Sequence, residues 1–374
     1  MRAGRQVLLD LLRGGLQPDT IGDVEWAAVL DAAEQESILP YAAERLRGLA
    51  GECPPVYMRR LDEIRREAEV SGFIWTETLK NALRAFHRAR LPVISLKGPC
   101  LAERLYGDAA LRTCHDLDLL VRRSDFARAG ELLTSIGYAP HSRGDDYHRP
   151  WRRKAIILEL HHDVENPNTF AFDVDGAWKR ARLSEFHGAP VRLLSEADEL
   201  LYLCLHAVRH RFDRLSLIVD LTLAFRRFRL PLSGEPAWSD PVFENVVALG
   251  WMMAKRLASQ IETPGILRVG PRNRKRLEQL ADRIWQEQMF APPAILDWAA
   301  QHRFFLEVET PGWNRMVRRW RYLRILLTRV IDDDFIFAER FNFHRDWQVR
   351  MLRPVRLAIK GMRGSPRGSR GALL

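Results

Sequence analysis

The stretch from Leu91 to Val121 limits the possible folds of this chain more than any other. Residues 91–96 have the apolar, partly β-branched composition of a short strand, and a Lys97-Gly98 turn separates them from a helix-like run. Asp116 and Asp118 then lead into a second apolar strand. Because side chains two residues apart in a strand point to the same face, we expect the two carboxylates to converge.

Two neighbouring carboxylates repel each other unless a cation neutralises them. Their hard oxygen atoms suit Mg²⁺, which proteins usually hold with one or two carboxylates and the phosphates of a substrate. Asp116 and Asp118 therefore indicate one part of a two-metal site for phosphoryl or nucleotidyl transfer. The other interpretation of this pair is a turn or a helix cap, which aspartate commonly forms.

A third carboxylate, Glu159, lies in the apolar run from 156 to 160. A charge in such a strand is costly unless it is paired or bound to a metal, so Glu159 is a candidate for the same site. The alternative interpretation of Glu159 is a position on an edge strand, facing water. Removal of Asp118 is expected to alter folding very little, because it would remove one of several charges that repel each other.

Composition favours a globular protein of ordinary charge content with an anionic partner. The 374 residues are enough for two or three cores. The net charge of +10 suits a nucleotide, a nucleic acid or an acidic surface as the partner. An arginine-rich protein with no such partner has the same composition. Four scattered cysteines with no Cys-x-x-Cys pair indicate reduced thiols and a cytoplasmic location. No signal peptide and no membrane span are expected.

The spacing of apolar residues predicts four regions. Residues 1–88 have helical spacing, with a kink or break expected at Ser71-Gly72. Residues 89–194 alternate short strands with helices, which predicts an α/β or α+β core on a small mixed sheet. Residues 195–350 form a C-terminal helical domain. Residues 351–374 form a basic tail that is too poor in apolar residues to fold alone.

One helix is expected to open at Ser195 and to continue as far as Phe225. It would bring a group of polar side chains onto one face: His206, His210, Asp213 and Asp220. Two histidines four residues apart can bind Zn²⁺, but no glutamate follows the first one as the zinc-protease pattern requires. These histidines either line a ligand cleft or only pack.

In the order and spacing of these residues, most of 20–340 resembles the uncharacterised nucleotidyltransferase family of the DNA polymerase beta-like superfamily. The resemblance rests on Leu96-Lys97-Gly98, Leu101-Ala102, Leu105-Tyr106, Arg112, Asp116-Leu117-Asp118, Gly137-Tyr138, Leu158-Glu159-Leu160-His161, Leu203-Cys204-Leu205-His206, His210 and Asp220. Two positions depart from the superfamily. At the first, Lys97-Gly98-Pro99 replaces a common Gly-Ser, so a phosphate-binding hydroxyl is absent and Lys97 could substitute for it. At the second, Glu159 replaces the usual aspartate.

The resemblance implies transfer of a nucleoside monophosphate from a nucleoside triphosphate, with ATP favoured, to a hydroxyl or phosphate acceptor. The implied catalytic and metal-binding residues, which would hold Mg²⁺ or Mn²⁺, are Asp116, Asp118 and Glu159. The implied nucleotide-binding residues are Lys97, Gly98, Arg112, His206 and His210. The alternatives for two of them are structural: Lys97 as a surface strand end, and Arg112 as the ion-pair partner of Asp108.

Two other functions compete with this one. His161-His162-Asp163 with His206 and Asp220 has the composition of a His-Asp metal phosphohydrolase, although that class places its His-Asp pair on a helix and these residues follow a strand. The second competing function is non-enzymatic: a former nucleotidyltransferase, or relic, that only binds a nucleotide or a partner. With no Cys/His finger and no aromatic run for base stacking, a small molecule, peptide or protein acceptor is favoured. The basic tail could attract RNA weakly, or could equally be a solvated end.

Overall fold

The computed structural model describes most of the chain up to residue 309 and short segments beyond it: 2–16, 23–49, 54–142, 147–165, 170–228, 242–265, 267–290, 298–309, 312, 315–317, 319–320, 332–341, 345, 348–349, 351–352 and 355–356. The chain divides into two compact units, Met1–Pro311 and Gly312–Leu374. The predicted basic tail falls almost entirely outside the described residues. The division into four regions stays a prediction.

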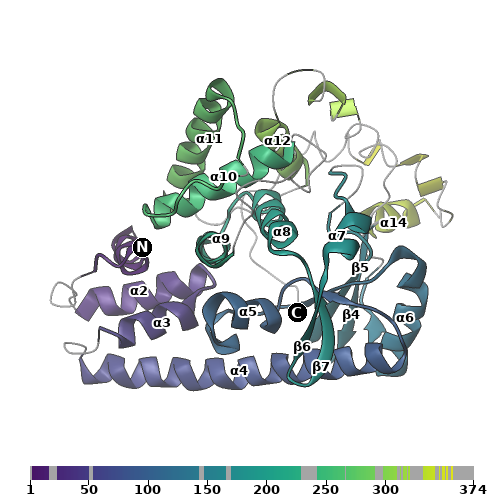
Figure 1. Ribbon diagram of the computed structural model, residues 1–374, viewed down its shortest axis with the longest axis horizontal. Coiled ribbons are helices and arrows are strands. Elements are labelled where there is room, and N and C mark those ends of the chain that lie inside the picture. Colours follow the sequence, from purple (N-terminus) through teal and green to yellow (C-terminus); the bar gives the residue numbers. More distant parts are fainter. Residues whose placement is uncertain are drawn as a thin grey trace. The chain divides into compact units, whose positions relative to one another are not determined.

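The N-terminal region is helical, as predicted: α1 (Arg2–Arg13), α2 (Asp23–Gln35), α3 (Leu39–Arg47) and α4 (Pro55–Arg88). The predicted kink at Ser71-Gly72 is wrong, because α4 is continuous over 34 residues. Gly72 instead permits a close contact, since a Cβ atom there would lie 3.0 Å from backbone atoms of Ala110. Figure 1 shows α4 running alongside α3 and α5 as far as strands β6 and β7.

The core is a seven-stranded mixed sheet, which confirms the predicted fold class. Its strands lie in the order β3-β4-β5-β2-β1-β7-β6. The central strand β2 is parallel to β5 and antiparallel to β1, and β7 is parallel to β1. The bounds of the strands are β1 (Ile94–Ser95), β2 (Leu117–Leu120), β3 (Ala139–Pro140), β4 (His148–Arg153), β5 (Ile156–His161), β6 (Arg182–Phe186) and β7 (Ala189–Leu193).

Two apolar cores cover the two faces of this sheet. Leu119 and Leu160 belong to one core, together with apolar residues of α4 and of α6 (Phe126–Ser135). Leu120 belongs to the other core, with apolar residues of α5 (Pro99–Tyr106) and α8 (Glu196–Arg209). Because side chains alternate along a strand, the residues two positions from Leu120 also face α5 and α8. Asp118 is one of them.

The helical domain predicted after residue 195 begins with α8, α9 (Leu215–Arg227), α10 (Val242–Leu257), α11 (Pro271–Phe290) and α12 (Trp298–Val308). The prediction of one helix from Ser195 to Phe225 is wrong. Arg211 and Phe212 have positive φ angles of 52° and 56°, so the chain turns between α8 and α9. Phe212 is fully buried, and its N–H donates to the carbonyl of Ala207. Burial of this ring favours the turn despite the cost of its backbone conformation.

The remaining elements are α7 (Val174–Arg180), the 3₁₀ turns η3 (Ala109–Leu111) and η4 (Arg123–Asp125) and, in the second unit, α14 (Asp332–Glu339). None of the helices in the described part of the chain is both long and apolar enough to cross a membrane.

Candidate metal centre

Asp118 and Glu159 lie opposite each other on neighbouring strands. They are register partners in the parallel pair of β2 and β5, so both side chains point to the α8 side of the sheet. Asp116 lies two residues before Asp118, just ahead of β2. The edge-strand interpretation of Glu159 is wrong, because β5 lies between β4 and β2. The structure thus brings Asp118 and Glu159 together, and Asp116 lies close enough for the charges of both to act on it.

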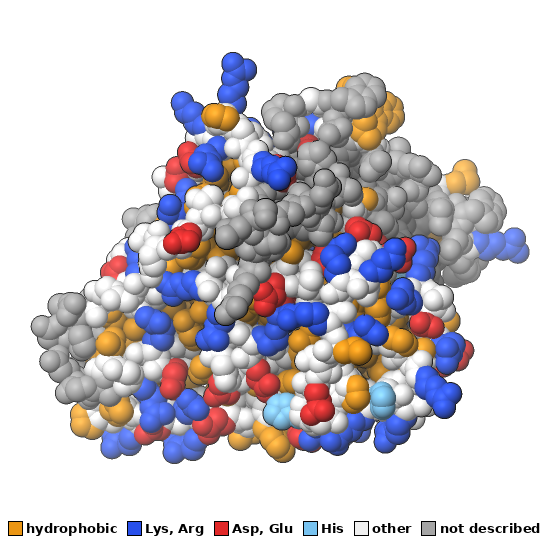
Figure 2. All heavy atoms as spheres, in the orientation of Figure 1, with side chains coloured by type: hydrophobic (Ala, Val, Ile, Leu, Met, Phe, Trp, Pro, Cys, Tyr) orange, Lys and Arg blue, Asp and Glu red, His pale blue; other side chains and the backbone are white. Residues whose placement is uncertain are grey.

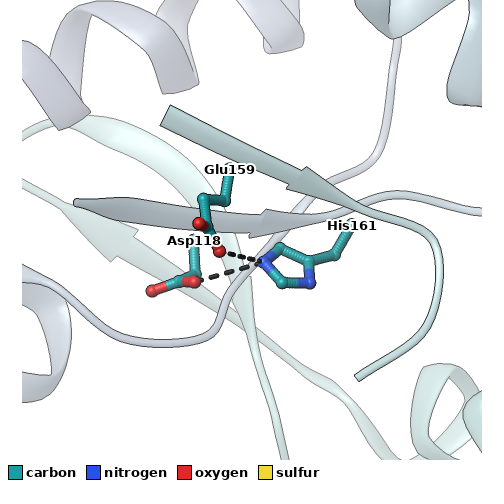
Figure 3. Close-up of side chains that lie close together, drawn as sticks. All are labelled: Asp118, Glu159 and His161. Carbon is teal, nitrogen blue, oxygen red and sulfur yellow. Dashed lines mark hydrogen bonds and ion pairs between the residues drawn. The ribbon is translucent and has the colours of Figure 1, made fainter. Parts of the chain in front are cut away.

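His161 joins this group, and the sequence argument did not assign it there. Its Nε2 lies 3.1 Å from Oδ1 of Asp118 and 3.4 Å from Oε2 of Glu159. In Figure 3 the ring nitrogen points between the two carboxylates. His161 is only 3% exposed, and its ring stacks on that of His148 with 5.0 Å between centroids. The signal that could have identified it is its position two residues after Glu159, on the same face of β5.

Lys97 contacts the same aspartate from the other side. Its Nζ lies 3.1 Å from Oδ2 of Asp118, and its side chain is 8% exposed, so the surface interpretation of Lys97 is wrong. Gly98 follows with a φ of 74°, which glycine adopts without strain, and precedes the first turn of α5. A Cβ atom on Gly98 would lie 3.3 Å from the side chain of Leu117. This turn therefore requires glycine, and it directs Lys97 into the site.

The charges of these groups depend on one another. Burial alone would raise the pKa of Asp118, but the ammonium of Lys97 and the hydrogen bond from His161 lower it below its usual range. The charge of Asp118, together with burial, raises the pKa of Asp116 to about 6. Burial would lower the pKa of His161, whereas its hydrogen bonds to Asp118 and Glu159 raise it to about 9. The site without a metal thus balances its carboxylates with Lys97 and His161.

This balance reverses the expectation that removal of Asp118 has little effect on folding. Its carboxylate is the ion-pair partner of Lys97 and an acceptor for His161, and all three side chains are buried. Loss of the carboxylate would leave a buried ammonium without that partner.

The residues present fit a divalent cation. Asp118, Glu159 and His161 each offer one ligand atom, and these atoms all lie within 4.8 Å of one another. Asp116 adds a further carboxylate beside Asp118. Carboxylate oxygens are the ligands that Mg²⁺ and Mn²⁺ prefer.

Arg112 is held by a residue far along the chain. Its Nε and Nη2 donate to the carboxylate of Asp220 in α9 at 3.1 Å and 2.9 Å, and the Tyr106 hydroxyl donates to the same carboxylate at 2.6 Å. The alternative interpretation of Arg112, as the ion-pair partner of Asp108, is therefore wrong in its partner. Asp108 instead caps η3 and pairs with Arg65.

His206 lies in the last turn of α8 and His210 is its C-cap residue, with 4.6 Å between their ring centroids. Burial lowers the pKa of both, to about 3 for His210, and the charge of Lys97 lowers each further. Both rings are therefore neutral and lie within the electrostatic field of the site. Their role in nucleotide binding stays a prediction. The sequence argument missed Arg209 between them, which donates to the Tyr147 hydroxyl and contacts Nδ1 of His206.

The structure does not assemble the rival His-Asp group. His161 lies on a strand, and the ring of His162 packs against Phe126 at 5.1 Å. Asp163 accepts hydrogen bonds from the backbone that follows it, and Asp220 binds Arg112.

Comparisons with known proteins identify one matching family. The model of a family described as “Uncharacterised nucleotidyltransferase” matches residues 22–252, which include every candidate residue above. The solution structure of the antibiotic-resistance factor ANT(2'')-Ia is 15% identical, covering 35% of this chain and 71% of that one, with a TM-score of 0.28. A tRNA-processing enzyme in apo form I is 12% identical, covering 79% and 93%, with a TM-score of 0.25. A comparison with curated proteins finds no match.

Proposed function

Because the chain belongs to the uncharacterised nucleotidyltransferase family, we propose that it moves a nucleoside monophosphate from a nucleoside triphosphate to a hydroxyl or phosphate acceptor and releases pyrophosphate. The convergence of Asp118 and Glu159 on one face of the sheet, with Asp116 within reach of their charges, supports this proposal most strongly. Three carboxylates on adjoining elements suit two divalent ions, Mg²⁺ or Mn²⁺.

Each carboxylate has a role in this proposal. Asp116 and Asp118 would hold the ion that binds the triphosphate, and Asp118 and Glu159 would hold the ion beside the acceptor. When bound, the ions supply positive charge for the phosphate oxygens and lower the pKa of the attacking hydroxyl. The protein would orient the acceptor for in-line attack on the α-phosphate, because Asp118 and Glu159 are fixed on two paired strands.

The nucleotide-binding residues surround this centre. Gly98 has no side chain, so phosphates could approach the backbone at the start of α5. Lys97 supplies a positive charge next to Asp118, and Arg112, fixed by Asp220, supplies a second for the departing pyrophosphate. His206 and His210 are neutral and would hydrogen-bond the nucleoside or the acceptor. We favour ATP as the nucleotide.

For the acceptor we favour a small molecule, a peptide or a protein. The sequence has no base-reading finger and no stacking platform. Among the residues drawn in colour, Figure 2 shows Lys and Arg side chains spread over the visible face between acidic and apolar ones, without one large basic surface. Contact with nucleic acid would then be weak and strongly salt-dependent.

Labelled nucleotides test the reaction class. Nucleoside triphosphates with label in the α- or the γ-phosphate are incubated with Mg²⁺ or Mn²⁺ and a panel of acceptors. We expect the α-label to enter the product and the γ-label to leave as pyrophosphate. Transfer of the γ-label, or a reaction that continues with a chelator present, would contradict the proposal. Nucleotide binding without any turnover across the panel would favour the relic.

A further inference from the structure

The imidazole of His161 has the contacts expected of a ligand that shares one ion with two carboxylates. Neighbouring ligands of a six-coordinate ion with bonds of 2.0–2.1 Å lie about 3.0 Å apart. Nε2 of His161 lies 3.1 Å from the carboxylate of Asp118 and 3.4 Å from that of Glu159. The two distances from His161 therefore have nearly the spacing that one ion would impose, and all three ligand atoms lie within 4.8 Å of one another.

We propose that His161 is itself a ligand of the metal, so that the centre binds Mn²⁺ in preference to Mg²⁺. This inference rests on the proposed function, since it concerns the same carboxylates. It adds a nitrogen ligand to a site that the sequence argument built from oxygen atoms alone.

The fold fixes this imidazole toward the carboxylates. His161 ends β5 on the same face as Glu159, and β2 places Asp118 beside them. His148, its register partner on β4, stacks on the ring with an angle of 16° between the planes. The ring is 3% exposed, so neither solvent nor a distant surface group competes for Nε2. When a divalent ion binds, it replaces the proton on that nitrogen, as at other histidine ligands.

A nitrogen ligand changes which ion is favoured. Mg²⁺ binds oxygen ligands almost exclusively in proteins and loses its water molecules reluctantly. Imidazole suits the later first-row transition ions best, and Mn²⁺, the weakest binder of that series, still accepts a nitrogen ligand more readily than Mg²⁺ does. Asp118 and Glu159 alone would suit either ion, so His161 is the residue that sets the preference.

Pulsed electron paramagnetic resonance of Mn²⁺ bound to the full chain tests the proposal. We expect coupling to a ¹⁴N nucleus in the wild-type protein, which changes to ¹⁵N coupling when the protein is produced with ¹⁵N-histidine. His161→Gln should abolish the coupling and weaken Mn²⁺ binding by about 10- to 100-fold, with a smaller effect on Mg²⁺ measured by competition. His162→Gln is the matched control, because the His162 ring lies against Phe126. This variant should leave the nitrogen coupling and the affinity for Mn²⁺ unchanged.

The outcomes separate this inference from the proposed function. If Mn²⁺ binds but shows no nitrogen coupling in the wild-type protein, His161 is not a ligand, and the nucleotidyltransferase proposal stands. Coupling that persists in a folded His161→Gln variant also overturns the inference, because the nitrogen then comes from another residue. If neither ion binds with or without a nucleoside triphosphate, the proposed function fails as well. The isotope experiment uses no variant, so misfolding of His161→Gln does not affect it.

Discussion

Replacement of Asp118 by alanine is expected to destabilise the protein as well as stop the reaction. The carboxylate is 1% exposed and lies 3.1 Å from both Nζ of Lys97 and Nε2 of His161. Removal of one partner of a buried ion pair costs about 3–5 kcal/mol. Asp116 and Glu159 remain nearby and offset part of this, so we expect about 3 kcal/mol, or a fall of about 4 °C in melting temperature for a chain of this length.

Thermal unfolding followed by circular dichroism measures the effect. A chelator in the buffer removes any stabilisation by bound metal, so the ion pair alone is compared. The double variant Lys97→Met/Asp118→Ala is the matched control. It should melt above Asp118→Ala, because it contains no buried ammonium without its partner. If the single variant melts at the wild-type temperature, or the double variant melts lower still, the ion-pair reasoning is refuted.

Three further variants test the surroundings of the site. Asp220→Ala should lower both the melting temperature and the rate of pyrophosphate release, because it removes the acceptor that holds Arg112, and Asp220→Asn should have a smaller effect on both. Gly72→Val should destabilise the protein by about 1–3 kcal/mol in urea unfolding through overlap with Ala110. Burial raises the pKa of Glu199 from 4.5 to about 7, so the folded state keeps a proton that the unfolded state has released, and stability falls as pH rises between these values. Melting temperatures at about pH 5 and about pH 8 should therefore differ less in Glu199→Gln than in the wild-type protein.

The strands that carry the carboxylates could be predicted because their signals are local. β2 and β5 lie inside the sheet, so their apolar runs are nearly continuous and a charged residue within them is conspicuous. The β6–β7 hairpin was not predicted, although His187-Gly188 is a two-residue turn with positive φ angles of 47° and 74°. Its first strand is an edge strand with mostly exposed residues, so its sequence lacks a clear apolar alternation.

The rest of the site depends on contacts between distant parts of the chain. No glycine or proline marks the end of α8, and the turn after it is stabilised by the burial of Phe212. Glu36, in the loop that follows α2, caps the N-terminus of α9. Its carboxylate accepts a hydrogen bond from the N–H of Leu215 at 2.9 Å. Arg112 likewise finds its partner 108 residues away. Periodicity and local motifs carry no information about such pairs.

Substitution of Glu159 by glutamine tests the central claim most directly. This side chain is 26% exposed, so its loss should affect folding less than the loss of Asp118, and glutamine retains its shape. Pyrophosphate release from a labelled nucleoside triphosphate is measured with Mg²⁺ or Mn²⁺ in the wild-type protein and in Glu159→Gln, with nucleotide binding and melting temperature recorded for both. We predict that the variant folds and binds the nucleotide, and that its rate of pyrophosphate release falls by at least about 100-fold. A folded variant that releases pyrophosphate at the wild-type rate would contradict the assignment of this carboxylate site as the catalytic centre.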